Sequence, residues 1–212
     1  MIQIIPAILA TTPEKYQEDI KKLNASDSLK EDGWVHIDFM DNKFVPNKSI
    51  NVSVVSEVQT NLKKEAHLMV ENPLEWITKC RDAGFNRVVF HFESKDVPQD
   101  VINLIKESGM ESGIALNPQT DPKVIEDLKN LDLILIMGVK PGFQGRPFEE
   151  NTYERIEQAV QINENISVDG AVKDENALKL VQSGAKILVS GSFILNGMID
   201  EQIEKIWEAV QG

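Results

Sequence analysis

Short apolar runs rich in β-branched residues alternate along the whole chain with longer, charged and amphipathic segments. This alternation is typical of repeated strand–helix units, because hairpin proteins join their strands by short turns. The predicted strands cover residues 2–9, 34–38, 65–70, 87–92, 111–116, 132–139, 165–169 and 186–191. Eight such units predict an α/β protein with a (β/α)8 TIM barrel, somewhat smaller than the roughly 250 residues typical of that fold. A doubly wound open sheet is the alternative, but no G-x-G-x-x-G motif follows the first strand.

Helix signals occur in four of the segments between the predicted strands. The predicted helices cover residues 12–23, 72–84, 100–109 and 174–184. Thr12 is a capping residue, and Pro13 occupies the first helical position. The other three helices end on Gly84, Gly109 and Gly184, which suit the left-handed conformation that ends helices. The segment after the second strand has the weakest helical pattern.

The composition is ordinary for a soluble globular protein, with 42% hydrophobic and 26% charged residues. No linker or shift in composition divides the chain, so we expect a single domain over residues 1–212. The formal net charge is −12, which argues against nucleic acid or an anionic membrane as a partner, since both require a basic surface. An anionic small molecule would have to be held by a local group of donors.

Cysteine content and hydropathy bear on the cellular compartment. Cys80 is the single cysteine, so this chain alone can form neither an intramolecular disulfide nor a thiolate metal cage. The first residues lack the basic segment of a secretion signal, and no apolar run approaches the roughly 18 residues that span a bilayer. We therefore expect a cytoplasmic protein.

The stretch "VHIDFMDNKFVPN" begins in the second predicted strand and has two different faces. Side chains alternate along a strand, so Val35 and Ile37 point one way while His36 and Asp38 point the other. On an isolated strand the polar face would meet solvent. In a closed barrel it points into the interior near the C-terminal end, where function resides in this fold. A charge in that position needs a partner or a metal ion.

The three histidines of the chain, His36, His67 and His91, all fall in the C-terminal halves of predicted strands. Asp169 ends the seventh predicted strand and shares a face with Ser167. Each of these residues alone would suit a hydrogen-bonded core position. Together, His36, Asp38, His67 and Asp169 predict a site for one divalent metal ion, and such nitrogen and oxygen ligands suit zinc, iron, manganese or cobalt. We interpret His91 as a structural residue.

Glycine-rich segments follow the last three predicted strands. They read "KPGFQGRPF" after strand six, "DGAV" after strand seven and "SGSF" after strand eight. Glycine lets the backbone approach a ligand and offer its N–H groups, and loops after strands seven and eight often bind phosphate in this fold. Each segment alone could be turn chemistry. The three together predict a phosphate site in an acidic protein.

A series of motifs spans nearly the whole chain: "PAILA", "VHIDFMDNKFVPN", "HLMVENP", "FHFES", "GIALNP", "IMGVKPGFQGRPF", "VDGAV" and "VSGSF". In order and spacing they resemble the motifs of the ribulose-phosphate 3-epimerase family. The resemblance implies that the metal ligands Asp38 and Asp169 also serve as catalytic acid and base. It implies that Met40, Met69 and Met137 shield the reacting face of the substrate. It further implies substrate contacts from Ala7, His67, Gly142, Phe143, Gln144, Gly145, Gly170, Ala171, Gly191 and Ser192.

The sequence departs from the family pattern at several of these positions. The family usually has serine in place of Ala7, a second glycine in place of Ala171, and glycine in place of Asn42. The missing hydroxyl and the added methyl group concern substrate identity and affinity, because no proposed ligand or catalytic group is lost.

The resemblance implies an isomerase of the pentose phosphate pathway, a metal-dependent epimerase acting at C3 of a ketose phosphate, with D-ribulose 5-phosphate and D-xylulose 5-phosphate as its substrate pair. It also implies a homo-oligomer. Two alternatives stay open: an epimerase of another phosphorylated ketose such as allulose 6-phosphate, and a non-catalytic sugar-phosphate-binding barrel. The phosphohexulose synthase and orotidylate decarboxylase barrels lack support, since their Asp-x-Lys-x-x-Asp signature is absent where this chain reads "EAHLMVEN".

Overall fold

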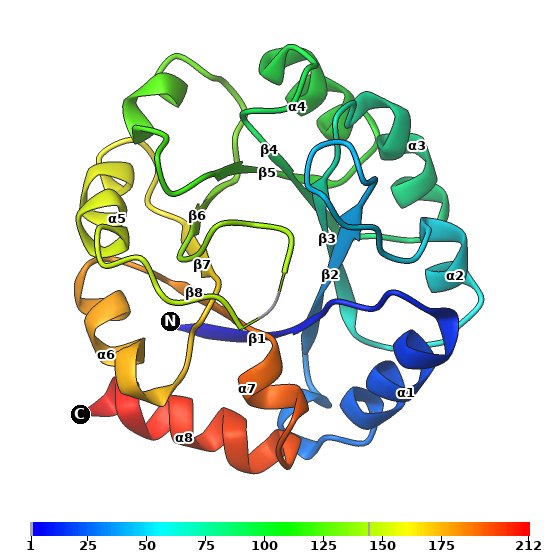
Figure 1. Ribbon diagram of the computed structural model, residues 1–212, viewed down its shortest axis with the longest axis vertical. Helices are drawn as coiled ribbons and strands as arrows, with labels where there is room; N and C mark the ends of the chain where they lie inside the picture. The colour runs from blue at the N-terminus through cyan, green and yellow to red at the C-terminus, as the bar shows by residue number, and fades with distance from the viewer. Residues whose placement is uncertain (1, 144) are drawn as a thin grey trace.

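The strands form a closed, entirely parallel barrel in which each strand neighbours the next in sequence and β1 also pairs with β8 (Figure 1). The computed structural model describes residues 2–143 and 145–212. The strands are β1 (Gln3–Ile8), β2 (Trp34–Met40), β3 (Lys63–Met69), β4 (Arg87–His91), β5 (Glu111–Leu116), β6 (Leu133–Met137), β7 (Ile166–Asp169) and β8 (Ile187–Ser190). The predicted (β/α)8 TIM barrel is therefore confirmed.

Helices surround the barrel on its outside (Figure 1). They are α1 (Pro13–Asn24), α2 (Val52–Ser56), α3 (Leu74–Asp82), α4 (Pro98–Glu107), α5 (Thr152–Val160), α6 (Asp174–Gln182), α7 (Ser192–Leu195) and α8 (Ile199–Gln211), with short 3-10 helices η1 (Asp27–Leu29) and η2 (Pro122–Ile125). The four predicted helices correspond to α1, α3, α4 and α6, with shifts of up to two residues at their ends. Thr12 caps α1 as predicted, because its hydroxyl oxygen accepts the Lys15 N–H at 3.3 Å.

Two connections contain little α-helix. The weak pattern after β2 corresponds to α2, a helix of five residues with the sequence VSVVS. Valine and serine are poor helix formers, because valine loses side-chain freedom in a helix and serine competes for backbone hydrogen bonds. The connection between β5 and β6 contains the 3-10 helix η2 in place of an α-helix.

The side chains of each strand divide between two hydrophobic layers. Val35 and Ile37 are fully buried in the larger layer between strands and helices. A separate cluster that includes Ile5, Val89 and Leu135 fills the barrel interior. The predicted two-faced strand is thus confirmed, since His36 and Asp38 point to the interior and are also buried.

Arg155 on α5 connects the outer layer to the C-terminal end of the barrel. Its buried guanidinium donates to the backbone carbonyls of Asn117 at 2.6 Å and Met137 at 3.2 Å. Burial lowers the pKa of Arg155 to about 10, so the group stays charged at neutral pH. The loops after β5 and β6 are therefore held to one helix, which fixes one side of the cavity described below.

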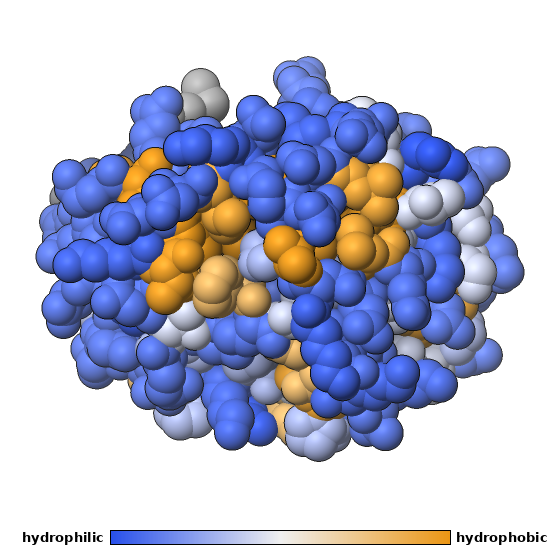
Figure 2. All heavy atoms as spheres, turned by 90° about the horizontal axis from the view of Figure 1, so that it is seen from above, coloured by the Kyte–Doolittle hydropathy of each residue, from blue (hydrophilic) through white to orange (hydrophobic). Residues whose placement is uncertain are grey.

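The side of the molecule drawn in Figure 2 is mostly hydrophilic, and its hydrophobic side chains gather in a few separate patches. None of the helices in the described residues combines the length and apolar character that crossing a membrane requires.

Candidate active site

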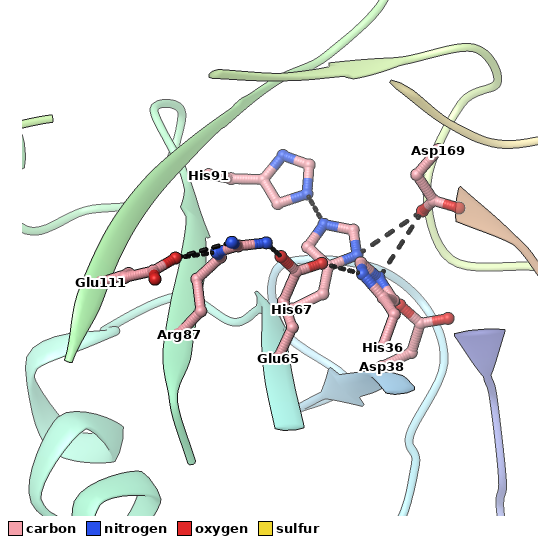
Figure 3. Close-up of polar contacts among 8 residues, drawn as sticks. All are labelled: His36, Asp38, Glu65, His67, Arg87, His91, Glu111 and Asp169. Carbon is pink, nitrogen blue, oxygen red and sulfur yellow. Dashed lines mark hydrogen bonds and ion pairs between the residues drawn. The ribbon is translucent and has the colours of Figure 1, made fainter. Parts of the chain in front are cut away.

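The four predicted metal ligands lie together at the C-terminal end of the barrel (Figure 3). His36 and Asp38 project from β2, His67 from β3, and Asp169 from the last position of β7. Asp38 and His67 are direct neighbours in the register of β2 and β3. Each residue contributes one donor atom, and these atoms all lie within 4.8 Å of one another. Parallel strands that end at one level thus bring together residues that are far apart in sequence.

The donor atoms face one another at short distances. Nδ1 of His67 lies 2.9 Å from Oδ1 of Asp38, and Nε2 of His36 lies 3.2 Å from the same oxygen. Oδ2 of Asp169 lies farther away, 3.7 Å from the His67 nitrogen and 3.9 Å from the His36 nitrogen. Both histidines are fully buried. The two carboxylates therefore approach the histidine pair from different strands.

A cavity of about 330 Å³ opens above these residues. Asp38 and Asp169 line it, together with residues of the glycine-rich loops after β6, β7 and β8. Of the predicted substrate contacts, it is lined by Ala7, Gly142, Phe143, Gly145, Gly170, Ala171, Gly191 and Ser192. His67 is buried beside the cavity, and Gln144 lies outside the described residues. The cavity is of a size that accommodates a small ligand.

Residues 3–195 match the family described as the ribulose-phosphate 3 epimerase family. The chain belongs to this family. Its members are isomerases, and the region matched contains the whole barrel from β1 to β8.

Curated relatives agree with this assignment to the ribulose-phosphate 3-epimerase family. The ribulose-phosphate 3-epimerase of Bacillus subtilis is 34% identical over 204 residues, which cover 92% of each chain. The enzyme of the same name from Aquifex aeolicus is 36% identical over 182 residues, covering 81% of this chain and 82% of the relative. The chloroplastic ribulose-5-phosphate-3-epimerase of Arabidopsis thaliana is 34% identical over 204 residues, covering 91% of this chain and 71% of the relative.

Solved structures of more distant proteins share the fold. A mutant tryptophan synthase alpha-subunit from Pyrococcus furiosus superposes with a TM-score of 0.71 at 15% identity, covering 99% of this chain and 98% of the other. A 3-hexulose-6-phosphate synthase also gives a TM-score of 0.71 at 15% identity, covering 99% and 100%. At this level of identity the likeness concerns the barrel alone.

The two aspartates of this epimerase-family site differ in their surroundings. Burial raises the pKa of Asp38, but hydrogen bonds from His36 and His67 outweigh it and hold the pKa below its usual range. Burial also raises the pKa of Asp169, and the more distant histidines offset this only in part, so its pKa lies above its usual range. The pKa shifts of the two carboxyl groups therefore have opposite directions, downward for Asp38 and upward for Asp169.

The donor set fits a divalent cation. Two imidazole nitrogens and two carboxylate oxygens converge in a buried place, and such sets bind zinc, iron, manganese or cobalt. A cation would also neutralise the two carboxylates, which otherwise lie close together with their charge incompletely balanced. The cluster is therefore a candidate metal centre, and its donors do not by themselves select one of the four metals.

The outward-facing nitrogen of each histidine has its own partner. Nδ1 of His36 donates to Oε1 of Glu65 at 2.6 Å, and Nε2 of His67 lies 2.9 Å from Nε2 of His91. Burial lowers the pKa of His91 to about 4, so this ring is neutral at pH 7 and can either donate or accept one hydrogen bond. The sequence predicts a structural role for His91, and in the structure His91 contacts one of the candidate ligands directly.

The three methionines lie around the same cluster, and all are almost fully buried. Met69 and Met137 line the cavity, while Met40 packs against Met69 and Val45 in a small hydrophobic group. Met40 and Met69 are neighbours in the register of β2 and β3, and Met137 is the neighbour of Asp169 on β6 and β7. Apolar thioethers therefore border the carboxylates at the bottom of the cavity.

Two departures from the family pattern have unusual backbone conformations. Asn42 has φ 61° and Ala171 has φ 55°, both in the left-handed region. Glycine adopts this region without cost, which accounts for the family's preference at both positions. Asparagine tolerates it better than most residues, whereas alanine places its Cβ against the backbone. The turn after β7 is therefore strained in this chain.

Sequence reasoning missed two cations at the cavity. Arg146 and Lys173 line it, in the loops after β6 and β7. Phe143, a half-exposed predicted contact, lies under Arg146, with the guanidinium carbon 5.2 Å from its ring centroid. Their positions in the sequence could have indicated this role, because each cation lies within or directly after a glycine-rich segment of a chain with net charge −12. Both side chains bring positive charge to the loops in which we expected phosphate.

Proposed function

We propose that this protein epimerises a ketose phosphate at C3, and that D-ribulose 5-phosphate and D-xylulose 5-phosphate are its substrate pair. One observation carries the proposal: Asp38 and Asp169 line one cavity from strands β2 and β7, and their surroundings shift their pKa values in opposite directions. Paired carboxyl groups of this kind suit an acid and a base acting together. Membership of the ribulose-phosphate 3-epimerase family supports the choice of reaction.

The reaction requires one proton to leave and another to arrive on opposite faces of C3. The proton on C3 is acidic because the neighbouring carbon is a ketone. One aspartate, as carboxylate, removes that proton, and the other, as carboxylic acid, donates a proton to the opposite face. After one turnover Asp38 and Asp169 have exchanged protonation states, which suits the reverse direction, and proton exchange with solvent restores the starting state.

His36, His67, Asp38 and Asp169 would hold one divalent cation. When bound, such a cation supplies Lewis-acid stabilisation for the negative charge that develops on the substrate oxygens during proton removal. The buried histidines keep their inward nitrogens toward the carboxylates, and Met69 and Met137 limit the access of water to the reacting carbon. An environment poor in water strengthens the electrostatic interactions within the site.

We propose that the phosphate group lies against the glycine-rich loops after β6, β7 and β8. Gly170 has φ 109°, and a Cβ at this position would come within 2.6 Å of Cγ2 of Val139. This close packing requires glycine and leaves the cavity side of the loop free of a side chain. Arg146 and Lys173 at the same cavity add positive charge that favours a phosphorylated substrate.

A second candidate reaction is the epimerisation of another phosphorylated ketose, such as allulose 6-phosphate. Ala7 lines the cavity in place of the serine that the family usually carries, which removes a hydroxyl and leaves room for a larger sugar. Ala171 adds a methyl group at the loop after β7, where we propose that the phosphate binds, and so changes a second part of the cavity lining.

A coupled assay of the purified protein tests the proposal. Ribulose 5-phosphate and allulose 6-phosphate are tested separately as substrates. Each is assayed with the untreated protein, with protein from which a chelator has removed metal, and with that protein after zinc, iron, manganese or cobalt has been added back. We expect turnover of ribulose 5-phosphate that is lost on chelation and recovered with at least one metal. Turnover of allulose 6-phosphate alone would support the second candidate, and turnover that survives complete removal of metal would contradict the proposed metal dependence.

A further inference from the structure

A row of charged side chains connects the candidate metal centre to the opposite end of the barrel (Figure 3). It consists of His36, Glu65, Arg87 and Glu111, one residue from each of the consecutive strands β2 to β5. Each is the direct neighbour of the next in the register of the sheet. Because barrel strands are tilted, such a row runs from the interior toward the N-terminal end.

Hydrogen bonds link every step of the row. Glu65 uses both carboxylate oxygens: Oε1 accepts from Nδ1 of His36 at 2.6 Å, and Oε2 accepts from the Arg87 guanidinium at 2.8 Å. Arg87 in turn donates through Nε to Glu111 at 2.7 Å. The guanidinium carbon also lies 4.2 Å from the centroid of the Trp34 ring. Glu111 and Trp34 therefore hold the guanidinium of Arg87, and its Nη1 donates to Glu65.

Glu65 is fully buried, and Arg87 is 7% exposed. A buried carboxylate is costly unless it is paired and hydrogen-bonded. His36 and Arg87 supply these partners, one at each carboxylate oxygen. A carboxylate paired with an arginine accepts hydrogen bonds, so Nδ1 of His36, which lies 2.6 Å from Oε1 of Glu65, carries a proton.

We propose that Glu65 is a positioning residue for the metal centre and that Arg87 holds Glu65 in place. Glu65 fixes the His36 ring with Nδ1–H directed away from the cavity, and Nε2 is left as the nitrogen that faces Asp38 and Asp169. This inference rests on the metal centre in the function proposed above. Carboxylates that orient a ligand histidine also strengthen its basicity, and their loss typically weakens metal binding by about 10- to 100-fold.

Two variants and their combination separate positioning from simple structural support. Glu65→Met keeps the length of the side chain and removes both its charge and the oxygens that accept from His36 and Arg87. Arg87→Met removes the cation that balances Glu65. The double variant Glu65→Met/Arg87→Met removes both buried charges, so the metal-free protein should regain stability that the single variants lose. A positioning role predicts that metal affinity does not recover with it.

Cobalt(II) is a suitable probe, because its absorption spectrum reports binding without requiring turnover. The protein is titrated with cobalt, and the stability of the metal-free protein is measured separately by urea unfolding. Glu65→Met and the double variant should bind cobalt about 10- to 100-fold more weakly than the wild type. Asp19→Asn serves as the matched control: Asp19 is a buried carboxylate paired with Lys15 on the outer helix α1, and its loss should leave cobalt affinity unchanged.

The outcomes distinguish this inference from the proposed function. If the wild type binds cobalt and both Glu65 variants bind it equally tightly, the positioning role is overturned and the metal centre stands. If the double variant recovers cobalt affinity together with stability, the row is structural support only. A wild type that binds no cobalt overturns the metal centre, and the inference with it.

Discussion

At the scale of single residues, two aspartates in similar strand positions have different environments. Asp38 accepts hydrogen bonds from His36 and His67, which stabilise its ionised form. Oδ2 of Asp169 lies farther from the same two rings, and burial is the largest influence on the pKa of Asp169. In the reaction that we propose, this difference suits one carboxyl group to remove a proton and the other to donate one.

Asp38→Asn and Asp169→Asn should each abolish epimerisation in both directions. Each variant keeps the shape of the side chain but removes one of the two groups that transfer protons. Initial rates with ribulose 5-phosphate and with xylulose 5-phosphate measure the effect. Asp19→Asn, on the outside of the barrel, is the control and should retain its activity. Substantial turnover by either site variant would show that its aspartate is not required as acid or base.

Ala7→Ser should lower KM for ribulose 5-phosphate with little change in kcat. Ala7 lines the cavity and is the neighbour of His36 in the register of β1 and β2. A restored hydroxyl would add one hydrogen bond of about 0.5–1.5 kcal/mol, or roughly a 2- to 13-fold change in binding. Equal stabilisation of the ground and transition states changes KM alone.

The same variant distinguishes the two candidate substrates. If Ala7 makes room for a larger ketose phosphate, serine should harm turnover of allulose 6-phosphate. An unchanged or higher KM for ribulose 5-phosphate in the serine variant would count against a role of this position in binding that substrate.

At the scale of elements, the strands were predictable because buried parallel strands are runs of β-branched and apolar residues. The candidate ligands followed from those strands, since alternation assigns each residue to one face. Helix α8 was missed although Ile199, Ile203 and Ile206 repeat at helical spacing and are buried. The row from His36 to Glu111 could not be predicted, because its pairs depend on the register between strands, which a single sequence does not specify.

The turn between β7 and α6 allows a test of local strain. Ala171 has φ 55°, a conformation that costs an L-residue roughly 1–2 kcal/mol. Ala171→Gly should relieve this strain and lose about 0.5–1 kcal/mol through added freedom of the unfolded chain. We therefore expect stability in urea unfolding to stay the same or to rise by about 1 kcal/mol.

Ala209→Gly in helix α8 is the control for that substitution, and it should lower stability by about 1 kcal/mol. A loss of similar size at Ala171 would mean that the left-handed conformation there is not strained.

At the scale of the whole molecule, the C-terminal helix is tied to the segment that follows the first helix. Asp200 on α8 accepts hydrogen bonds from the Ser26 hydroxyl and from the Ser28 N–H at 2.9 Å. The Ser26 contact, more than any other, lowers the pKa of Asp200 to about 2. A carboxyl group whose pKa is lowered by folding stabilises the protein above its unfolded-state pKa, and this stabilisation is lost as the pH falls toward 2.

Asp200→Asn should therefore destabilise the protein at pH 7, by about 1 kcal/mol since the site is partly exposed. The difference from the wild type should shrink as the pH falls from 5 to 2. Glu201→Gln, a neighbouring acid in the same helical turn, is the control and should have little effect. Urea unfolding at several pH values measures both variants, and a pH-independent difference for Asp200→Asn would contradict the role assigned to its charge.

The homo-oligomer expected from the family resemblance stays a prediction, and sedimentation of the purified protein measures it.

The most direct test of the central claim is proton NMR of ribulose 5-phosphate incubated with the wild-type protein in deuterated water. Removal of a proton from one face of C3 and delivery of another to the opposite face should give xylulose 5-phosphate with deuterium at C3, and chelation of the metal should stop the exchange. Xylulose 5-phosphate that retains protium at C3, or exchange that continues unchanged without metal, would contradict the account.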